Sequence, residues 1–128
     1  MLSFVPYFEP CNIFVMDLEN SKAQLKKGVL EYCILSIISR GEAYASDILE
    51  EMKESRLIVV EGTLYPLLSR LKNDGLLSYN WVESKSGPPR KYYQLTEEGK
   101  LFMAELSQTW NDMVTAVTHI IEKTTINI

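Results

Sequence analysis

The stretch EGTLYPLLSRLKNDGLL at residues 61–77, followed by GPPRKYYQLT at residues 87–96, decides the fold of this chain. The leucines of the first segment recur at helical spacing, which predicts a helix over residues 62–74 with one apolar side. Pro66 falls near the first turn, where a proline is tolerated, and Gly75 supplies the C-terminal stop. The second segment predicts the return strand of a hairpin with a basic tip. A helix followed directly by such a hairpin is typical of a winged helix.

Polar side chains lie off the leucine side of this predicted helix. Thr63, Tyr65 and Ser69 can hydrogen-bond phosphates or base edges. Arg70 can contact phosphate, or it can instead pair with an acid within the domain. On its own, such a face is as typical of an ordinary solvated helix as of a recognition helix.

The hairpin tip carries Arg90, Lys91 and Tyr92, which suit the minor groove or the flanking phosphates. A charged tip is usually only a solvated turn, but its position directly after a candidate recognition helix favours DNA binding. The charge distribution agrees, because the chain has a net charge of −4 whereas residues 70–95 carry five basic and two acidic side chains. A phosphate-facing surface needs this local positive field rather than a basic average.

The remaining elements follow from apolar periodicity and turn residues. Ser21 is expected to be the N-cap of the first helix and Thr96 that of the last. Helices are predicted over residues 21–39, 44–55, 62–74 and 97–123, an extended run over 58–60, strands over 77–82 and 91–95, and a turn over 84–89. The predicted fold is therefore mainly α with a small β-hairpin wing (α+β). It comprises a winged helix-turn-helix over residues 21–96 and a long C-terminal helix within residues 97–128.

Residues 1–20 are expected to form an N-terminal extension. The first fifteen are apolar but are broken by Pro6 and Pro10, and Met16 opens a more ordinary start. This segment is therefore interpreted as lying upstream of the start of a shorter protein. The alternative is a strand or arm that packs on the domain.

The predicted last helix carries an apolar seam with a period of about 3.5 residues, which is typical of helices that pair. The seam consists of Met103, Leu106, Trp110, Met113, Val117 and Ile120. It predicts a dimer interface, although it could also pack on the chain's own first helix. If two copies of Trp110 face each other across a two-fold axis, they could wall a flat pocket for planar aromatic ligands. The simpler interpretation is an interface anchor without a ligand.

Several other functions find no support in the sequence. The two separated cysteines, Cys11 and Cys33, and the single histidine, His119, lack metal-ligand spacing. No nucleophile–base pair or phosphate-cradling loop suggests catalysis, so neither an enzyme nor a cofactor is expected. No apolar run approaches the ~20 residues that span a bilayer, and the cytoplasm is the expected location.

Residues 26–96 closely resemble the PadR family of winged-helix transcription regulators. The resemblance rests on GTLYPLL at residues 62–68 with the following Arg70-Leu71, on DGLL at residues 74–77, and on PRKYY at residues 89–93 with the following Leu95-Thr96. It implies a cytoplasmic homodimer whose third helix and wing bind a near-palindromic DNA operator, usually to repress. It also implies that the long last helix dimerises, and it associates the family with phenolic acids or hydrophobic drugs. The chain departs from the family at Pro88, where a basic residue is common.

The resulting prediction is a dimeric DNA-binding repressor that a planar aromatic effector relieves. The DNA contacts are assigned to Thr63, Tyr65, Ser69, Arg70, Arg90, Lys91 and Tyr92. The effector or dimer contacts are assigned to Leu106, Trp110, Met113, Val117 and Ile120. The alternatives are a winged-helix protein-interaction module without DNA binding and a small ligand carrier.

Overall fold

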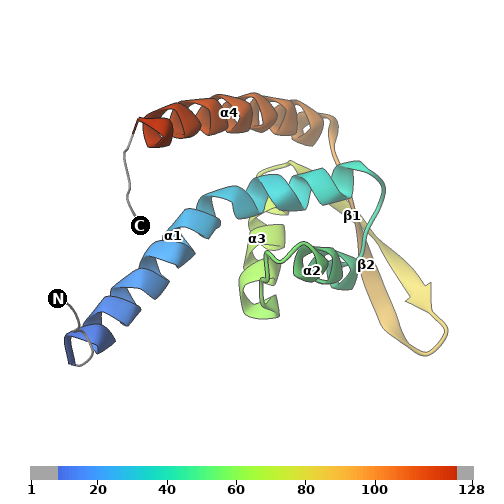
Figure 1. Ribbon diagram of the computed structural model, residues 1–128. Helices are drawn as coiled ribbons and strands as arrows, with labels where there is room; N and C mark the ends of the chain where they lie inside the picture. Colours follow the sequence, from blue (N-terminus) through green and yellow to red (C-terminus); the bar gives the residue numbers. More distant parts are fainter. Residues whose placement is uncertain (1–8, 124–128) are drawn as a thin grey trace. The chain divides into compact units, whose positions relative to one another are not determined.

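The computed structural model describes the backbone of residues 9–123 and the side chains from Asp17 onward (Figure 1). Its elements are α1 (Glu9–Ser39), α2 (Ala45–Glu54), α3 (Glu61–Asn73), β1 (Leu77–Ser84), β2 (Gly87–Leu95) and α4 (Glu97–Glu122). This order of helices around one antiparallel hairpin confirms the predicted winged helix-turn-helix with a long last helix. None of the helices in the described residues is long and apolar enough to cross a membrane.

Helix α1 starts earlier than the sequence predicted. It begins at Glu9 rather than after Ser21, so the prediction of Ser21 as an N-cap was wrong. Pro10 lies in the first turn, where its missing N–H and fixed φ do little harm, and no further proline follows within the helix. The predicted extension of residues 1–20 therefore includes helical backbone from Glu9, while residues 1–8 lie outside the described part of the chain. The described residues form two units that meet within α1, between Glu31 and Tyr32.

The core lies in the second unit, which starts at Tyr32, and it is built from one side of each short helix. Leu64, Leu68 and Leu71 of α3 are fully buried, which confirms the predicted leucine stripe. Their partners in the core include Ile34, Leu35, Ile38, Ile48 and Met52. Burial of these side chains is the main stabilising contribution, because each is worth about 1.5–3 kcal/mol relative to an exposed position.

The hairpin is longer than predicted, and its pairing continues to Gly87, inside the predicted turn. Its register places Tyr79 opposite Tyr93 and Trp81 opposite Lys91. Beyond the irregularity between Val82 and Ser84, Ser84 pairs with Gly87. The prolines of β2 lie at this open tip, where a missing N–H is tolerated.

The other edge of β2 pairs with Ala43, which exchanges two main-chain hydrogen bonds with Tyr93 at 3.1 and 2.8 Å. This short pairing comes just before α2. The extended run that the sequence predicted at residues 58–60 forms no strand, although Val60 at its end has extended backbone. The bridge fixes the start of α2 against the wing.

Helix α3 ends in a glycine-dependent cap. Gly75 has φ of +82°, a left-handed conformation that favours glycine. The Leu76 N–H donates to the Leu71 carbonyl at 2.9 Å and the Gly75 N–H donates to the Lys72 carbonyl at 3.0 Å. These two bonds form a Schellman motif, which turns the chain directly into β1.

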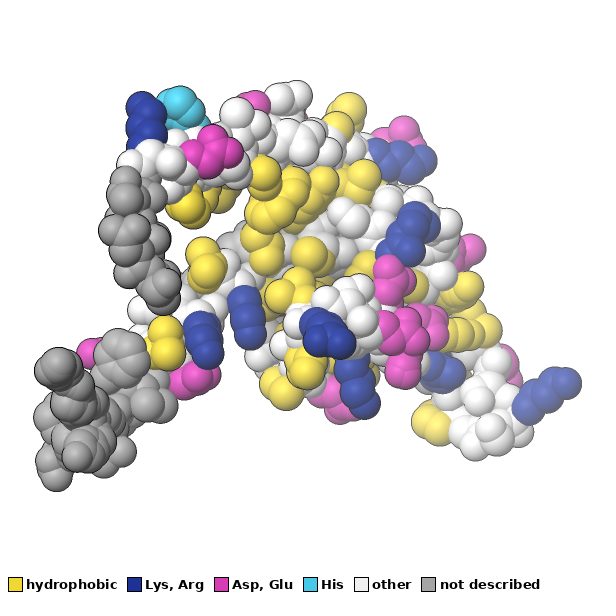
Figure 2. Space-filling model, in the orientation of Figure 1, with side chains coloured by type: hydrophobic (Ala, Val, Ile, Leu, Met, Phe, Trp, Pro, Cys, Tyr) yellow, Lys and Arg dark blue, Asp and Glu magenta, His cyan; other side chains and the backbone are white. Residues whose placement is uncertain are grey.

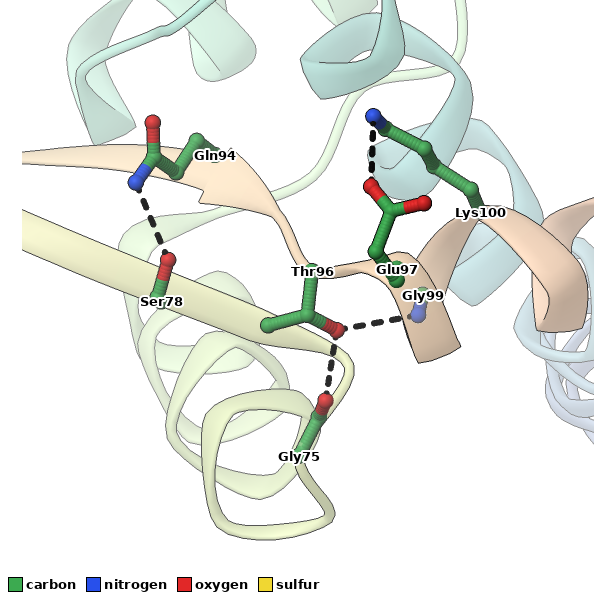
Figure 3. A network of polar contacts seen from close by, with 7 residues as sticks. All are labelled: Gly75, Ser78, Gln94, Thr96, Glu97, Gly99 and Lys100. Atoms are coloured by element: carbon green, nitrogen blue, oxygen red, sulfur yellow. Dashed lines mark hydrogen bonds and ion pairs between the residues drawn. The ribbon is translucent and has the colours of Figure 1, made fainter.

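The start of α4 is held by this same turn (Figure 3). The Thr96 hydroxyl donates to the Gly75 carbonyl at 2.6 Å and accepts from the Gly99 N–H at 2.9 Å. The Thr96 N–H donates to the Leu76 carbonyl at 3.1 Å. Thr96 is therefore the N-cap of α4, as predicted, and it also joins α4 to the end of the candidate recognition helix.

Candidate nucleic-acid interface

The predicted recognition helix exposes its polar face. Thr63, Tyr65, Ser69 and Arg70 are all exposed, opposite the buried leucines of α3. Gly62 and Pro66 are also exposed, so two small residues lie among these longer side chains. A slim helix of this kind can approach the floor of the major groove.

A shallow cleft of about 370 Å³ lies between α3, the start of α2 and the wing. Its lining consists of Tyr44, Ala45, Ser46, Tyr65, Ser69, Trp81, Pro89, Arg90, Lys91 and Tyr93. The cleft brings together four of the seven predicted DNA contacts, from segments that are about twenty residues apart in the sequence. Thr63, Arg70 and Tyr92 lie outside its lining.

Arg90 of the wing is held against the start of α2. One guanidinium nitrogen donates to the Ser46 hydroxyl at 2.5 Å, and the guanidinium carbon lies 3.9 Å from the centroid of the Tyr44 ring. The Tyr44 ring in turn stacks on Tyr92, with centroids 4.6 Å apart. Tyr92 therefore supports the tyrosine on which Arg90 rests. This stack presents a preoriented cation at the edge of the cleft.

Lys91 points along the other face of the hairpin, where it lies over two aromatic rings. Its ammonium is 4.5 Å from the Tyr79 centroid and 5.5 Å from the Trp81 centroid. Lys72 at the end of α3 lies 5.9 Å from the same Tyr79 ring. Lys72 of α3 and Lys91 of the wing therefore lie over the same ring of the hairpin, whereas Arg90 lies against Tyr44 and Ser46.

The charge of the cleft suits an anion. Among the described residues that line it, two are cationic and none carries a carboxylate. Burial raises the pKa of Tyr93, and the neighbouring Tyr79 and Tyr65 raise it further, so this hydroxyl keeps its proton to a higher pH than an exposed tyrosine does. DNA phosphates accept hydrogen bonds from hydroxyl and cationic side chains of this kind.

Six lining residues were not among the predicted contacts: Tyr44, Ala45, Ser46, Trp81, Pro89 and Tyr93. Ser46 is separated from Arg90 by 44 positions, and no local pattern relates them. Tyr44 is brought in by the bridge at Ala43. Trp81 had a usable signal, because period-two alternation already placed it on the same face as Tyr79.

The second group of predicted residues lies along α4. Figure 2 shows apolar side chains gathered on one side of this helix, and the exposed ones include Trp110 at 41% and Ile120 at 66%. Met113 and Val117 are also exposed, whereas Leu106 is half-buried. Such a row of large exposed apolar side chains is more than the singly scattered ones of an ordinary protein surface.

The chain is similar to proteins of one family in both sequence and fold. The sequence pattern described as "Transcriptional regulator PadR-like family" matches residues 34–105. A solved PadR-like transcription factor from Bacteroides fragilis is 60% identical, with a TM-score of 0.68 over 79% of this chain and 98% of that one. A PadR-like regulator from Bacillus cereus is 37% identical, with a TM-score of 0.70 over 79% and 99% of the two chains.

A PadR family regulator from Eggerthella lenta is 28% identical and has a TM-score of 0.78 over 88% of this chain and 98% of that one. The family pattern spans more than half of the sequence, and the likeness extends over nearly the whole length of each of these regulators. The chain therefore belongs to the PadR-like family of DNA-binding transcriptional regulators.

Proposed function

We propose that this protein is a cytoplasmic repressor that binds a near-palindromic DNA operator as a homodimer. Residues 21–96 form the DNA-binding part and residues 97–128 the dimerising part. The recognition helix α3 enters the major groove, where Thr63, Tyr65 and Ser69 contact bases or phosphates. Arg70, Arg90, Lys91 and Tyr92 contact the backbone.

The observation that carries this proposal is the cleft between α3 and the wing. Tyr65 and Ser69 come from the helix, whereas Arg90 and Lys91 come from the wing, and all four line the same cavity of about 370 Å³. If the helix face and the hairpin tip only contacted solvent, they would not be expected to line one cleft with two cations and no carboxylate. A DNA backbone that passes between the two elements accounts for this arrangement.

The apolar row on α4 supports the dimer. Trp110, Met113, Val117 and Ile120 are too exposed to be explained by the core of one chain. A second copy that packs on this row covers it and presents two recognition helices. In a helix-turn-helix dimer these lie about 34 Å apart, one turn of DNA.

The effector is proposed to be a planar aromatic compound that binds between the two copies of Trp110. An indole from each copy provides flat apolar walls, which favour stacking. Titration of the wild-type protein with phenolic acids and with planar aromatic cations should quench its tryptophan fluorescence. If no compound quenches, and Trp110→Ala leaves induction intact, Trp110 is only an interface anchor.

Binding to the protein's own promoter region, measured by electrophoretic shift, tests the main proposal. Wild-type protein should shift this DNA at lower concentration than a mixed-sequence duplex. Lys91→Ala should weaken binding to both, and it should reduce the slope of log K against log salt by about one unit for each copy in the complex. The matched control is Lys100→Ala, which removes an exposed lysine of α4 outside the cleft.

Two outcomes contradict this proposal. If the wild-type dimer binds no duplex at low salt, the protein works as a protein-interaction module. If Lys91→Ala and Lys100→Ala behave alike, the wing does not contact DNA.

A further inference from the structure

Trp81 is the most exposed aromatic side chain of the hairpin, at 62%. Although exposed, it has a defined orientation. The Tyr79 ring meets it edge to face, with centroids 5.9 Å apart, and the Lys91 ammonium lies 5.5 Å from its centroid. The orientation of the indole is therefore fixed, while most of its surface is left uncovered by the described residues.

The indole forms one wall of the cleft. The lining also includes the hydroxyl-bearing side chains Tyr65 and Ser69 of α3, with Ser46 at the start of α2. Arg90 and Lys91 provide the charge. Aromatic rings, several hydroxyls and two cations are a mixed lining, which suits a ligand that is both apolar and anionic.

The sugar–phosphate backbone of DNA has this mixed character, because apolar deoxyribose faces alternate with charged phosphates. If α3 occupies the major groove and the wing reaches the adjacent minor groove, the strand that separates these grooves runs between helix and wing. The cleft lies at this position. This step rests on the DNA binding proposed above.

We infer that the cleft seats one strand of the duplex, and that Trp81 packs its indole against a deoxyribose of that strand. The indole N–H donates to a neighbouring phosphate, and Ser46, Tyr65 and Ser69 provide further hydroxyl donors. Arg90 and Lys91 neutralise the charge. Because every nucleotide has the same sugar and phosphate, Trp81 strengthens binding to all sequences and does not select among them.

Substitution of Trp81 tests this inference on two duplexes of about 30 base pairs, long enough for two half-sites one helical turn apart. One duplex is selected by the wild-type protein from a random pool, and the other has mixed sequence. Trp81→Ala should weaken binding to both by a similar factor of roughly 10 to 100, since each copy of the dimer loses one apolar contact. The salt slope should not change, because no charge is removed.

The matched control is Leu101→Ala. This variant also removes a large exposed apolar side chain, which is 71% exposed on α4 and away from the cleft. It should bind both duplexes like the wild type. Unchanged affinity of folded, dimeric Trp81→Ala would overturn the inference. A loss confined to the selected duplex would also overturn it, because Trp81 would then read bases.

Hydroxyl-radical footprinting of the wild-type protein tests the same contact without a variant. Either duplex should protect Trp81 from oxidation, whereas Leu101 should stay equally reactive. A complex that forms but leaves Trp81 unprotected would overturn the inference while the proposed function stands. If wild-type protein binds neither duplex, the proposed function itself fails.

Discussion

Gly99 in the first turn of α4 lies directly against the main-chain carbonyl of Leu76, which follows the glycine cap of α3. A methyl group at position 99 would overlap the Leu76 carbonyl oxygen, and its distance to the carbonyl carbon would be only 3.0 Å. Backbone on both sides leaves no flexible side chain to move away. The contact, together with the Thr96 hydroxyl bonds, fixes where α4 leaves the winged helix-turn-helix.

Gly99→Ala should therefore destabilise the protein although alanine is the better helix former. We expect the free energy of unfolding to fall by about 3 kcal/mol, the upper range for an overpacked site. Urea unfolding at fixed protein concentration measures this loss. Gly28→Ala on exposed α1 is the control, because nothing lies within 4 Å of the added methyl. It should raise stability by up to about 1 kcal/mol. Equal effects of the two substitutions would refute the close contact.

Thr96→Ala removes both hydrogen bonds of the N-cap hydroxyl. It leaves the Gly75 carbonyl and the Gly99 N–H without this partner, so we expect a loss of about 1–2 kcal/mol. Thr96→Ser keeps the hydroxyl and should retain most of the wild-type stability in the same urea experiment. A serine variant as unstable as the alanine variant would show that the methyl group, not the hydroxyl, matters.

Arg90→Lys separates charge from geometry at the wing. Lysine keeps the positive charge, but it cannot keep a planar stack on Tyr44 together with the bond to Ser46. Duplex binding should weaken by roughly 5- to 10-fold with an unchanged salt slope, whereas Arg90→Ala should also lower the slope by about one unit per copy. Fluorescence anisotropy of labelled DNA at several salt concentrations distinguishes these outcomes. Wild-type affinity of the Arg90→Lys variant for the duplex would mean that the stack on Tyr44 does not orient the cation.

Alkaline pH should destabilise the protein through Tyr93. Because burial and the nearby tyrosines raise its pKa in the folded state, the unfolded chain loses this proton first. The free energy of unfolding should therefore be constant with respect to this group below pH 10 and fall above it, by at most about 1.4 kcal/mol per pH unit. Urea titrations from pH 8 upward should show a shallower alkaline decline for Tyr93→Phe. An identical decline in both proteins would refute the assignment.

The sequence predicted the parts of this fold that depend on local chemistry. The leucine stripe of α3, the stop at Gly75 and the cap at Thr96 each have a signal within a few residues. The predicted start of α1 was wrong. Pro10 and its apolar neighbours resembled a break in the helix, although a proline is tolerated in the first turn.

The candidate site was predicted only in part, because some of its contacts join segments that are distant in the sequence. Tyr65 and Arg90 could be recognised from their own segments, whereas the partners of Arg90 could not. Tyr44 and Ser46 reach the wing because Ala43 pairs with Tyr93, and a two-residue bridge leaves almost no periodic pattern. Contacts between distant segments of this kind depend on packing, which local propensity does not encode.

Val117→Glu tests the apolar row of α4 as the dimer interface. A carboxylate buried between two copies would be desolvated without a partner, which costs several kcal/mol. The variant should remain folded, because Val117 is 48% exposed in the single chain, but it should become monomeric at micromolar concentration. Light scattering after size exclusion measures the mass, and binding to a two-half-site duplex should weaken in parallel. Thr115→Glu, on the opposite side of α4, adds the same charge and should leave the dimer intact. If both variants stay dimeric, the two copies associate through another surface.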